Sequence, residues 1–306
     1  MTNRRDFLKN LLAAGAGMGL LSGVSPKVND QRDDGLFFDL SLAEWSLHRT
    51  INSGKMTNLD FPRVAREEFD IRAVEYVSTF FKTTKLQYVS ELRNICVNEG
   101  INNVLIMVDG EGDLGDTDNA AREKAVENHF KWIETAKYLG CQTIRVNARG
   151  HGDSQEVARA AIDGLGRLSE RAAHDGINVV VENHGGHSSN GKWLAGVIRS
   201  VDMPNCGTLP DFGNFTIGEG QKYDRYKGIR ELMPWAKGVS AKTYDFDEQG
   251  NETTMDFHRI LKIVRDAHYH GYIGIEYEGS RLGEKQGIAA TKKLLEGVGE
   301  SLSRGR

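Results

Sequence analysis

The sequence predicts an α/β protein that folds as a single-domain (β/α)8 barrel, the TIM barrel. Short β-rich segments alternate with amphipathic helical segments from Gly35 onward, and eight such strand segments occur. Strands that alternate with helices pair in parallel, and eight such units close a barrel. An open, doubly wound sheet normally carries a Gly-rich phosphate loop after its first strand, and the segment SLAEWSLHRT is not such a loop. No linker or low-complexity tract interrupts residues 35–306, so we expect one domain there.

The bulk composition agrees with this fold class. A chain of 306 residues is long enough for one complete barrel. Hydrophobic residues make up 39% and charged residues 27% of the chain, which is typical of a globular protein. The formal net charge of −4 argues against binding to a phosphate backbone, so we expect no nucleic-acid partner.

Residues 1–28 have the layout of an export signal. Arg4 and Arg5 precede Phe7, Leu8 and Lys9, and the Gly- and Ala-rich run LLAAGAGMGLLSGVSP follows. This order resembles the twin-arginine signal, which predicts a periplasmic or otherwise exported protein. The apolar run is too short and too Gly-rich to span a membrane, and no Cys follows it, so we expect no stable membrane anchor. The alternative interpretation is an ordinary cationic amphipathic helix.

Each predicted strand is rich in β-branched or other apolar residues and ends in polar ones. Val179, Val180 and Val181, for example, lead directly into Glu182, Asn183 and His184. The eight strands are predicted within residues 36–48, 72–80, 103–110, 142–150, 178–186, 206–215, 237–246 and 272–280.

Four helices between the strands are indicated by the 3.6-residue spacing of apolar residues. They are predicted within residues 85–98, 128–140, 153–176 and 255–271. Gly140, Gly176 and Gly271 are expected to end the last three, and Asp153 or Ser154 to cap the start of the third. The three cysteines, Cys96, Cys141 and Cys206, have no metal-ligand spacing, so we expect buried thiols.

Acidic residues recur at the predicted carboxyl ends of the strands, which meet in one pocket of a (β/α)8 barrel. A single carboxylate there is usually a solvated tip, but several that converge repel one another unless a cation or proton lies among them. The residues are Glu75, Glu182, Asp211 and Glu276. We therefore expect one divalent metal ion. Oxygen ligands suit Mg or Mn, and a nearby histidine favours Mn, Co or Zn.

The motifs WSLH, VEYV, VVVENHGG, LPDFGNF, VSAKTYDF and IGIEYEG occur in this order. The ordered set resembles the sugar phosphate isomerase/epimerase family with a xylose isomerase-like barrel. Members similar to ketose 3-epimerases bind one divalent metal, and the resemblance implies Glu182, Asp211 and Glu276 as its ligands. The chain departs from the family at two positions, because Ser240 and Asn214 stand where the family has histidines.

The resemblance also implies a mechanism, in which Glu182 and Glu276 exchange a proton on opposite faces of a carbon beside a carbonyl. Lys242 is a third candidate catalytic residue. Burial near a cation should lower its pKa and make it a general base; alternatively, it forms an ion pair with Glu75 or Asp211. A base on one face only favours β-elimination, so a sugar lyase or dehydratase is the second hypothesis.

The substrate is expected to be a non-phosphorylated sugar, because the chain has no Gly-rich loop or basic cluster that could hold a phosphate. The candidate substrate-binding residues are Trp45, His48, Glu75, His184 and Asn214. A non-catalytic sugar-binding barrel is a further alternative. An apurinic endonuclease is disfavoured, because few of the 9 histidines fall at strand ends. A homo-oligomer remains open.

Overall fold

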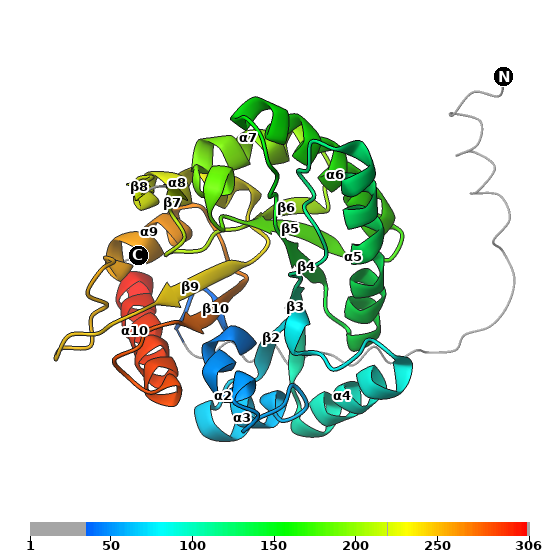
Figure 1. Cartoon of the computed structure of the whole chain (residues 1–306). Coiled ribbons are helices and arrows are strands. Elements are labelled where there is room, and N and C mark those ends of the chain that lie inside the picture. The colour runs from blue at the N-terminus through cyan, green and yellow to red at the C-terminus, as the bar shows by residue number, and fades with distance from the viewer. Residues whose placement is uncertain (1–34, 219, 305–306) are drawn as a thin grey trace, which may run out of the picture. The chain divides into compact units, whose positions relative to one another are not determined.

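The computed structural model describes residues 35–218 and 220–304. Eight parallel strands form one sheet in the order β6-β5-β4-β3-β2-β1-β10-β9, and helices surround it (Figure 1). The strands are β1 (Asp39–Ala43), β2 (Ala73–Val77), β3 (Asn102–Met107), β4 (Thr143–Val146), β5 (Asn178–Glu182), β6 (Cys206–Leu209), β9 (Val239–Thr243) and β10 (Tyr272–Tyr277). Each strand overlaps one of the predicted segments, so the fold class and all eight strands are confirmed.

The barrel closes between β6 and β9 through three backbone hydrogen bonds rather than a continuous ladder. Lys237 N donates to Thr208 O at 3.0 Å, and Ser240 N donates to Pro210 O at 3.0 Å. Phe212 N donates in turn to Ser240 O at 3.1 Å. This closing seam places Asp211 beside Ser240.

Helices follow the strands around the outside of the barrel. They are α2 (His48–Asn52), α3 (Phe61–Phe69), α4 (Leu86–Glu99), α5 (Asn119–Leu139), α6 (Ser154–Ala173), α7 (Gly191–Val201), α8 (Arg225–Leu232), α9 (Phe257–Asp266) and α10 (Glu284–Arg304). Short 3-10 turns lie at Glu44–Leu47, Ser78–Phe80, Gly186–Ser189 and Met233–Trp235. A two-stranded hairpin, β7 (Thr216–Gly218) and β8 (Gln221–Lys222), follows β6.

The four predicted helices are present, with corrected ends. Asp153 caps α6 and forms a capping box with Glu156, whereas α5 begins nine residues earlier than predicted (128 − 119), because Asp118 caps it. The prediction that Gly271 ends a helix is wrong, since α9 already ends at Asp266.

One apolar position of the first predicted helix is also corrected. Leu86 is 67% exposed, while Val89, Leu92 and Cys96 form the buried face of α4. All three cysteines are buried and free, as predicted. The three-residue spacing that began at Leu86 drifts off the buried face, because a helix turns in 3.6 residues.

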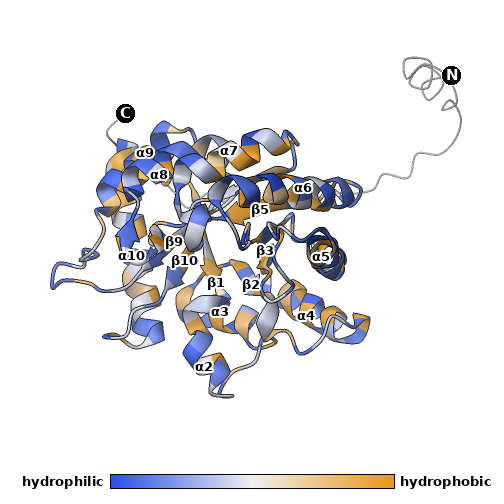
Figure 2. Ribbon diagram, turned by 45° about the horizontal axis from the view of Figure 1, so that its top comes forward, coloured by the Kyte–Doolittle hydropathy of each residue, from blue (hydrophilic) through white to orange (hydrophobic). Residues whose placement is uncertain are grey.

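The hydrophobic core has two parts. The larger lies between the sheet and the helices, whose inward faces are apolar in Figure 2. The smaller fills the barrel interior with side chains from β1, β2, β3, β5 and β6: Ala43, Val77, Leu105, Met107, Val180 and Leu209. A packed interior of this kind leaves only the strand ends for chemistry.

The predicted export signal, residues 1–28, lies outside the described residues. Among the helices that the structure describes, none has the length and apolar character that a membrane crossing requires.

Candidate active site

Three carboxylates from three strand ends converge at the carboxyl end of the barrel. Glu182 ends β5, Asp211 follows β6, and Glu276 lies in β10. All three are buried, and one ligand oxygen from each lies within 4.8 Å of those of the others. The structure thus brings together the three predicted metal ligands.

Glu182 is held from two sides. Its Oε2 lies 2.6 Å from Nη2 of the buried Arg145, and its Oε1 accepts a hydrogen bond from Asn214 Nδ2 at 3.0 Å. Arg145 also donates to Asp109 at 3.0 Å. The guanidinium on β4 therefore fixes the direction of the Glu182 carboxylate and balances part of its charge.

Asp211 is fixed by the turn that follows it. Its Oδ1 accepts hydrogen bonds from the backbone N–H groups of Gly213 and Asn214, both at 2.7 Å. The fully buried Asn183 accepts from Asp211 N at 2.8 Å and donates to Asp211 O at 3.0 Å. These bonds leave Oδ2 of Asp211 facing Ser240 and Lys242.

The Ser240 hydroxyl lies between two carboxylates. Its Oγ is 3.0 Å from Asp211 Oδ2 and 2.6 Å from Glu276 Oε2. A hydroxyl has one proton to donate, so it satisfies one of these oxygens and turns a lone pair toward the other. A proton or cation is needed to relieve that second contact.

Lys242 supplies the ammonium group of the site. Its Nζ lies 3.1 Å from Glu276 Oε1, 3.3 Å from Glu278 Oε2 and 3.6 Å from Asp211 Oδ2, and its side chain is 2% exposed. Burial alone would lower the pKa of Lys242, but Asp211, Glu276, Glu182 and Glu278 raise it well above its usual value. The predicted ion pair with Asp211 is present, and the lowered pKa expected beside a bound cation stays a prediction.

Negative charge exceeds positive charge in this cluster. Five carboxylates (Asp109, Glu182, Asp211, Glu276 and Glu278) contact two cations, Arg145 and Lys242.

The pKa values of the triad reflect this imbalance. Burial raises the pKa of Asp211 to about 7 against the opposing effect of Lys242, and burial likewise raises the pKa of Glu182. The pKa of Glu276 is lowered, because Lys242 and Ser240 outweigh its burial. An excess of buried carboxylates with oxygens this close suits a hard divalent cation.

An aromatic stack lies beside the carboxylates. The Trp45 ring stacks on Phe80 at 5.8 Å and on His48 at 4.8 Å between centroids, with interplanar angles of 10° and 14°. Trp45 Nε1 donates to Glu278, the same residue that contacts Lys242. Trp45 is therefore connected to the carboxylate cluster, whereas His48 Nδ1 turns to the Trp45 carbonyl oxygen at 2.7 Å.

The other predicted substrate-binding residues occupy different depths. Glu75 is buried in the barrel interior, where Ser41 Oγ donates to it at 2.6 Å. A Cβ at position 274 would lie 2.6 Å from Glu75 Oε2, so Gly274 leaves the space that this carboxyl occupies. Asn214, as described above, binds Glu182. A direct contact between Glu75 and substrate stays a prediction.

His184 follows β5 and lies between Arg149 and the site. Arg149 Nη2 is 2.6 Å from His184 Nδ1, and an arginine only donates hydrogen bonds, so Nδ1 is the acceptor and the ring carries its proton on Nε2. Burial lowers the pKa of His184 to about 4, and Arg145, Lys242 and Arg149 act in the same direction. His184 is therefore neutral near pH 7.

The roles of Arg145, Ser240 and Glu278 were not predicted from the sequence. The signal for Ser240 and Glu278 is the two-residue period of a strand, which puts Ser240 on the face of Lys242 and Glu278 on the face of Glu276. For Arg145 the only indication in the sequence is weaker: it is a single charged residue within the otherwise uncharged strand β4.

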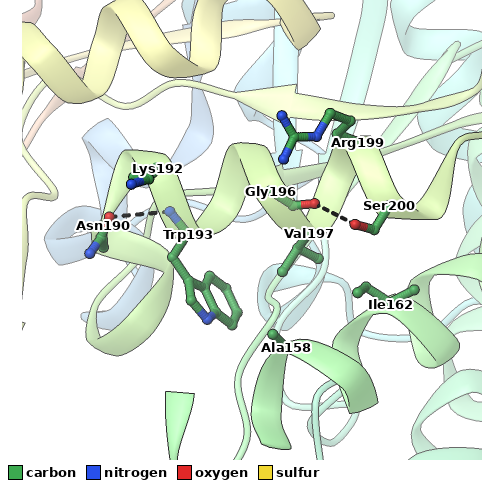
Figure 3. Close-up of a pocket in the computed structure, with 9 residues that line it drawn as sticks. All are labelled: Ala158, Ile162, Asn190, Lys192, Trp193, Gly196, Val197, Arg199 and Ser200. Atoms are coloured by element: carbon green, nitrogen blue, oxygen red, sulfur yellow. Dashed lines mark hydrogen bonds between the residues drawn. The ribbon is translucent and has the colours of Figure 1, made fainter. Parts of the chain in front are cut away.

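The hollow in Figure 3 is separate from this site. It lies between α6 and α7 in the outer helical layer and contains none of the residues described above. Its residues are Ala158, Ile162, Asn190, Lys192, Trp193, Gly196, Val197, Arg199 and Ser200.

A family model for the xylose isomerase-like TIM barrel matches residues 63–298. The chain belongs to this family. Among curated proteins, this xylose isomerase-like barrel is 42% identical over 66 residues to a C-glycoside deglycosidase alpha subunit of Arthrobacter globiformis. It is also 42% identical over 48 residues to a 3'-dehydrocarminate deglycosidase alpha subunit of a Microbacterium species. These matches cover 21% and 16% of the chain, and 19% and 14% of the two relatives.

Solved structures resemble the xylose isomerase-like barrel over most of its length. A D-tagatose 3-epimerase-like protein has a TM-score of 0.69 at 16% identity, over 88% of this chain and 99% of that one. A Mycobacterium smegmatis barrel in complex with magnesium has a TM-score of 0.66 at 15% identity, over 86% and 97%. The probable 3-DHS dehydratase AsbF of Bacillus anthracis has a TM-score of 0.62 at 18% identity, over 85% and 99%. At identities this low, the TM-scores show a shared fold and nothing further.

Proposed function

We propose that the protein is a divalent-cation-dependent isomerase or epimerase that acts on a non-phosphorylated sugar by removing a proton beside a carbonyl group. The observation that carries this proposal is the buried triad of Glu182, Asp211 and Glu276. The Ser240 hydroxyl has one proton for two carboxylate oxygens, those of Asp211 and Glu276. This unsatisfied contact and the excess of negative charge both fit a cation bound by the three triad residues. The magnesium complex of the Mycobacterium smegmatis barrel supports the choice of a hard cation.

The proton transfer is assigned to Glu182 and Glu276. They stand on β5 and β10, three steps apart around the barrel through β6 and β9, so a sugar carbon between them meets one carboxylate on each side. One carboxylate removes the proton, and the other, in its protonated form, delivers a different proton to the opposite face, which inverts that carbon. When bound, a divalent cation supplies Lewis-acid stabilisation of the charge that develops on the carbonyl oxygen.

Lys242 and the aromatic stack complete the proposed mechanism. The Lys242 ammonium, paired with Glu276 and Glu278, adds positive charge where the substrate oxygen becomes negative. The stack of Phe80, Trp45 and His48 presents a half-buried aromatic surface of the kind that packs on a sugar ring. His184 can donate from Nε2 to a sugar oxygen, because Arg149 holds its other nitrogen.

Elimination from a keto-sugar is the second candidate. Two observations favour it: a charged lysine on one side of the triad, which can donate a proton to a leaving oxygen, and the local similarity to two deglycosidase alpha subunits. The fold shared with a probable dehydratase agrees with this candidate. Export by the twin-arginine-like signal of residues 1–28 remains part of the proposal and fits a substrate without a phosphate group.

The test is proton exchange in deuterated water. The protein is incubated with Mn²⁺ and a panel of keto-sugars, aldo-sugars and 3-keto-glucosides, and mass spectrometry and NMR record deuterium at the carbon beside the carbonyl. We expect exchange that Glu182→Gln or Glu276→Gln lowers by at least about a hundredfold, while Glu127→Gln on the exposed face of α5 has no effect. Exchange accompanied by an isomeric sugar of unchanged composition indicates isomerisation, whereas loss of water or of an aglycone from the substrate indicates elimination. A substrate whose turnover survives both active-site substitutions would refute the assignment.

A further inference from the structure

The ammonium of Lys242 lies among the same carboxylates that the proposed cation needs. It contacts Glu276 Oε1 at 3.1 Å and Asp211 Oδ2 at 3.6 Å, and both residues belong to the triad. Its third contact, Glu278 Oε2 at 3.3 Å, lies outside the triad. The lysine therefore has two inner partners that a cation would also bind and one outer partner that a cation would leave free.

The surroundings of Lys242 confine its stem, and three carboxylates surround its ammonium group. A Cβ at Gly213 would lie 3.0 Å from Lys242 Cδ, so the stem packs closely on the backbone after β6. Lys242 itself pairs in register with Glu276 in the β9–β10 ladder. Because the stem is confined, the ammonium can shift only over a short path between its inner and outer carboxylates.

Glu278 is positioned to pair with the Lys242 ammonium group on the solvent side of the site. Its side chain is 26% exposed, whereas those of Asp211 and Glu276 are 0% and 4% exposed, so it lies on the solvent side of the lysine. Its other oxygen accepts a hydrogen bond from Trp45 Nε1, which holds the carboxylate in place. Trp45 in turn stacks between Phe80 and His48.

We propose that Lys242 is a built-in counter-cation that competes with the divalent cation for Asp211 and Glu276, and that it withdraws to Glu278 when the cation binds. The proposal rests on the cation site of the proposed function. Like charges in a buried site repel strongly, so the lysine weakens cation binding. Through Glu278 the cation state is also connected to Trp45, at the wall proposed to pack on the sugar.

The test is the affinity of the full-length protein for Mn²⁺ alone, measured by electron paramagnetic resonance of free Mn²⁺ and by calorimetry. Removing the ammonium with Lys242→Met should tighten Mn²⁺ binding roughly ten- to a hundredfold. Glu278→Gln should weaken it several-fold, because the displaced ammonium loses its outer partner. The matched control, Lys237→Met, removes an exposed lysine at the same seam and should change nothing.

The outcomes separate this inference from the proposed function. If the wild type binds Mn²⁺ and Lys242→Met binds it equally or more weakly, the counter-cation role is refuted while the cation site stands. If neither protein binds Mn²⁺, both proposals fail. If only Lys242→Met binds it, the competition is demonstrated directly. Should Lys242→Met fail to fold by circular dichroism, the Glu278→Gln result decides, and unchanged affinity in that variant refutes the role.

Discussion

The buried carboxyl group of Glu75 predicts that the free energy of unfolding depends on pH in a specific way. It is 1% exposed, and among the described residues Ser41 is the hydrogen-bond partner of Oε1 while Oε2 has none. Burial raises the pKa of Glu75 from 4.5 to about 8, with Glu276 and Glu182 adding to the rise. The folded pKa thus exceeds the unfolded one. Between pH 4.5 and 8 the folded state keeps a proton that the unfolded state loses, so stability falls as pH rises through this window.

The magnitude follows from the size of the shift. The difference between 8 and 4.5 is 3.5 units, which sets an upper limit of about 5 kcal/mol at about 1.36 kcal/mol for each unit. Glu75→Gln cannot ionise and escapes this loss. We expect the variant to match the wild type within about 1 kcal/mol at pH 5 and to exceed it by about 2–5 kcal/mol at pH 9.

The assay is urea unfolding at pH 5 and pH 9, with a chelator present to keep divalent cations from the triad. Glu127→Gln, an exposed carboxylate on α5, is the control and should show no pH-dependent difference from the wild type. If the stability difference between Glu75→Gln and the wild type is the same at both pH values, Glu75 ionises normally in the folded protein and the reasoning is wrong.

Four further substitutions test other parts of the structure. Arg145→Met leaves buried carboxylates without their cation and should cost about 3–5 kcal/mol, which thermal unfolding at pH 8 would detect; an unchanged midpoint would contradict the pairing. Leu92→Ala should cost about 2–5 kcal/mol in urea, whereas Leu86→Ala should stay within about 0.5 kcal/mol, because Leu92 is buried and Leu86 exposed. Gly228→Ala would place a Cβ 2.2 Å from the Phe215 ring and should lower stability by about 1–3 kcal/mol in thermal unfolding; an unaffected midpoint would mean that the ring moves freely.

The sequence was sufficient to predict the eight strands and acidic residues at their ends, and the family resemblance selected Glu182, Asp211 and Glu276 among them. Both depend on a pattern that survives without tertiary information: a buried parallel strand is continuously apolar, and its exit is marked by the first charged residue. Glu182 after three valines is the plainest case. The helix ends were less predictable, because a cap such as Asp118 or the exposure of Leu86 depends on where the helix packs.

The charge state of Lys242 could not be predicted from the chain alone. Burial and neighbouring charge shift a lysine pKa in opposite directions, and only the distances to the carboxylates decide between them. A cation near Lys242 was expected, but Glu278 was given no role, although it faces the same way as Glu276 two residues earlier. The burial of Glu75 could not be predicted for a similar reason. The space that its carboxyl group fills exists only because position 274, on another strand, is a glycine.

The seam between β6 and β9 has a consequence for the order of assembly. The bonds that close the barrel there, from Ser240 to Pro210 and from Phe212 to Ser240, also bring Asp211 to Ser240 and Lys242. A nascent or partly unfolded chain that has not made this last join holds its carboxylates on separate pieces and has no place to collect a cation. Binding of the proposed cation would then require a completely folded barrel, and a chain that opens at the seam would lose this cation before it loses its strands.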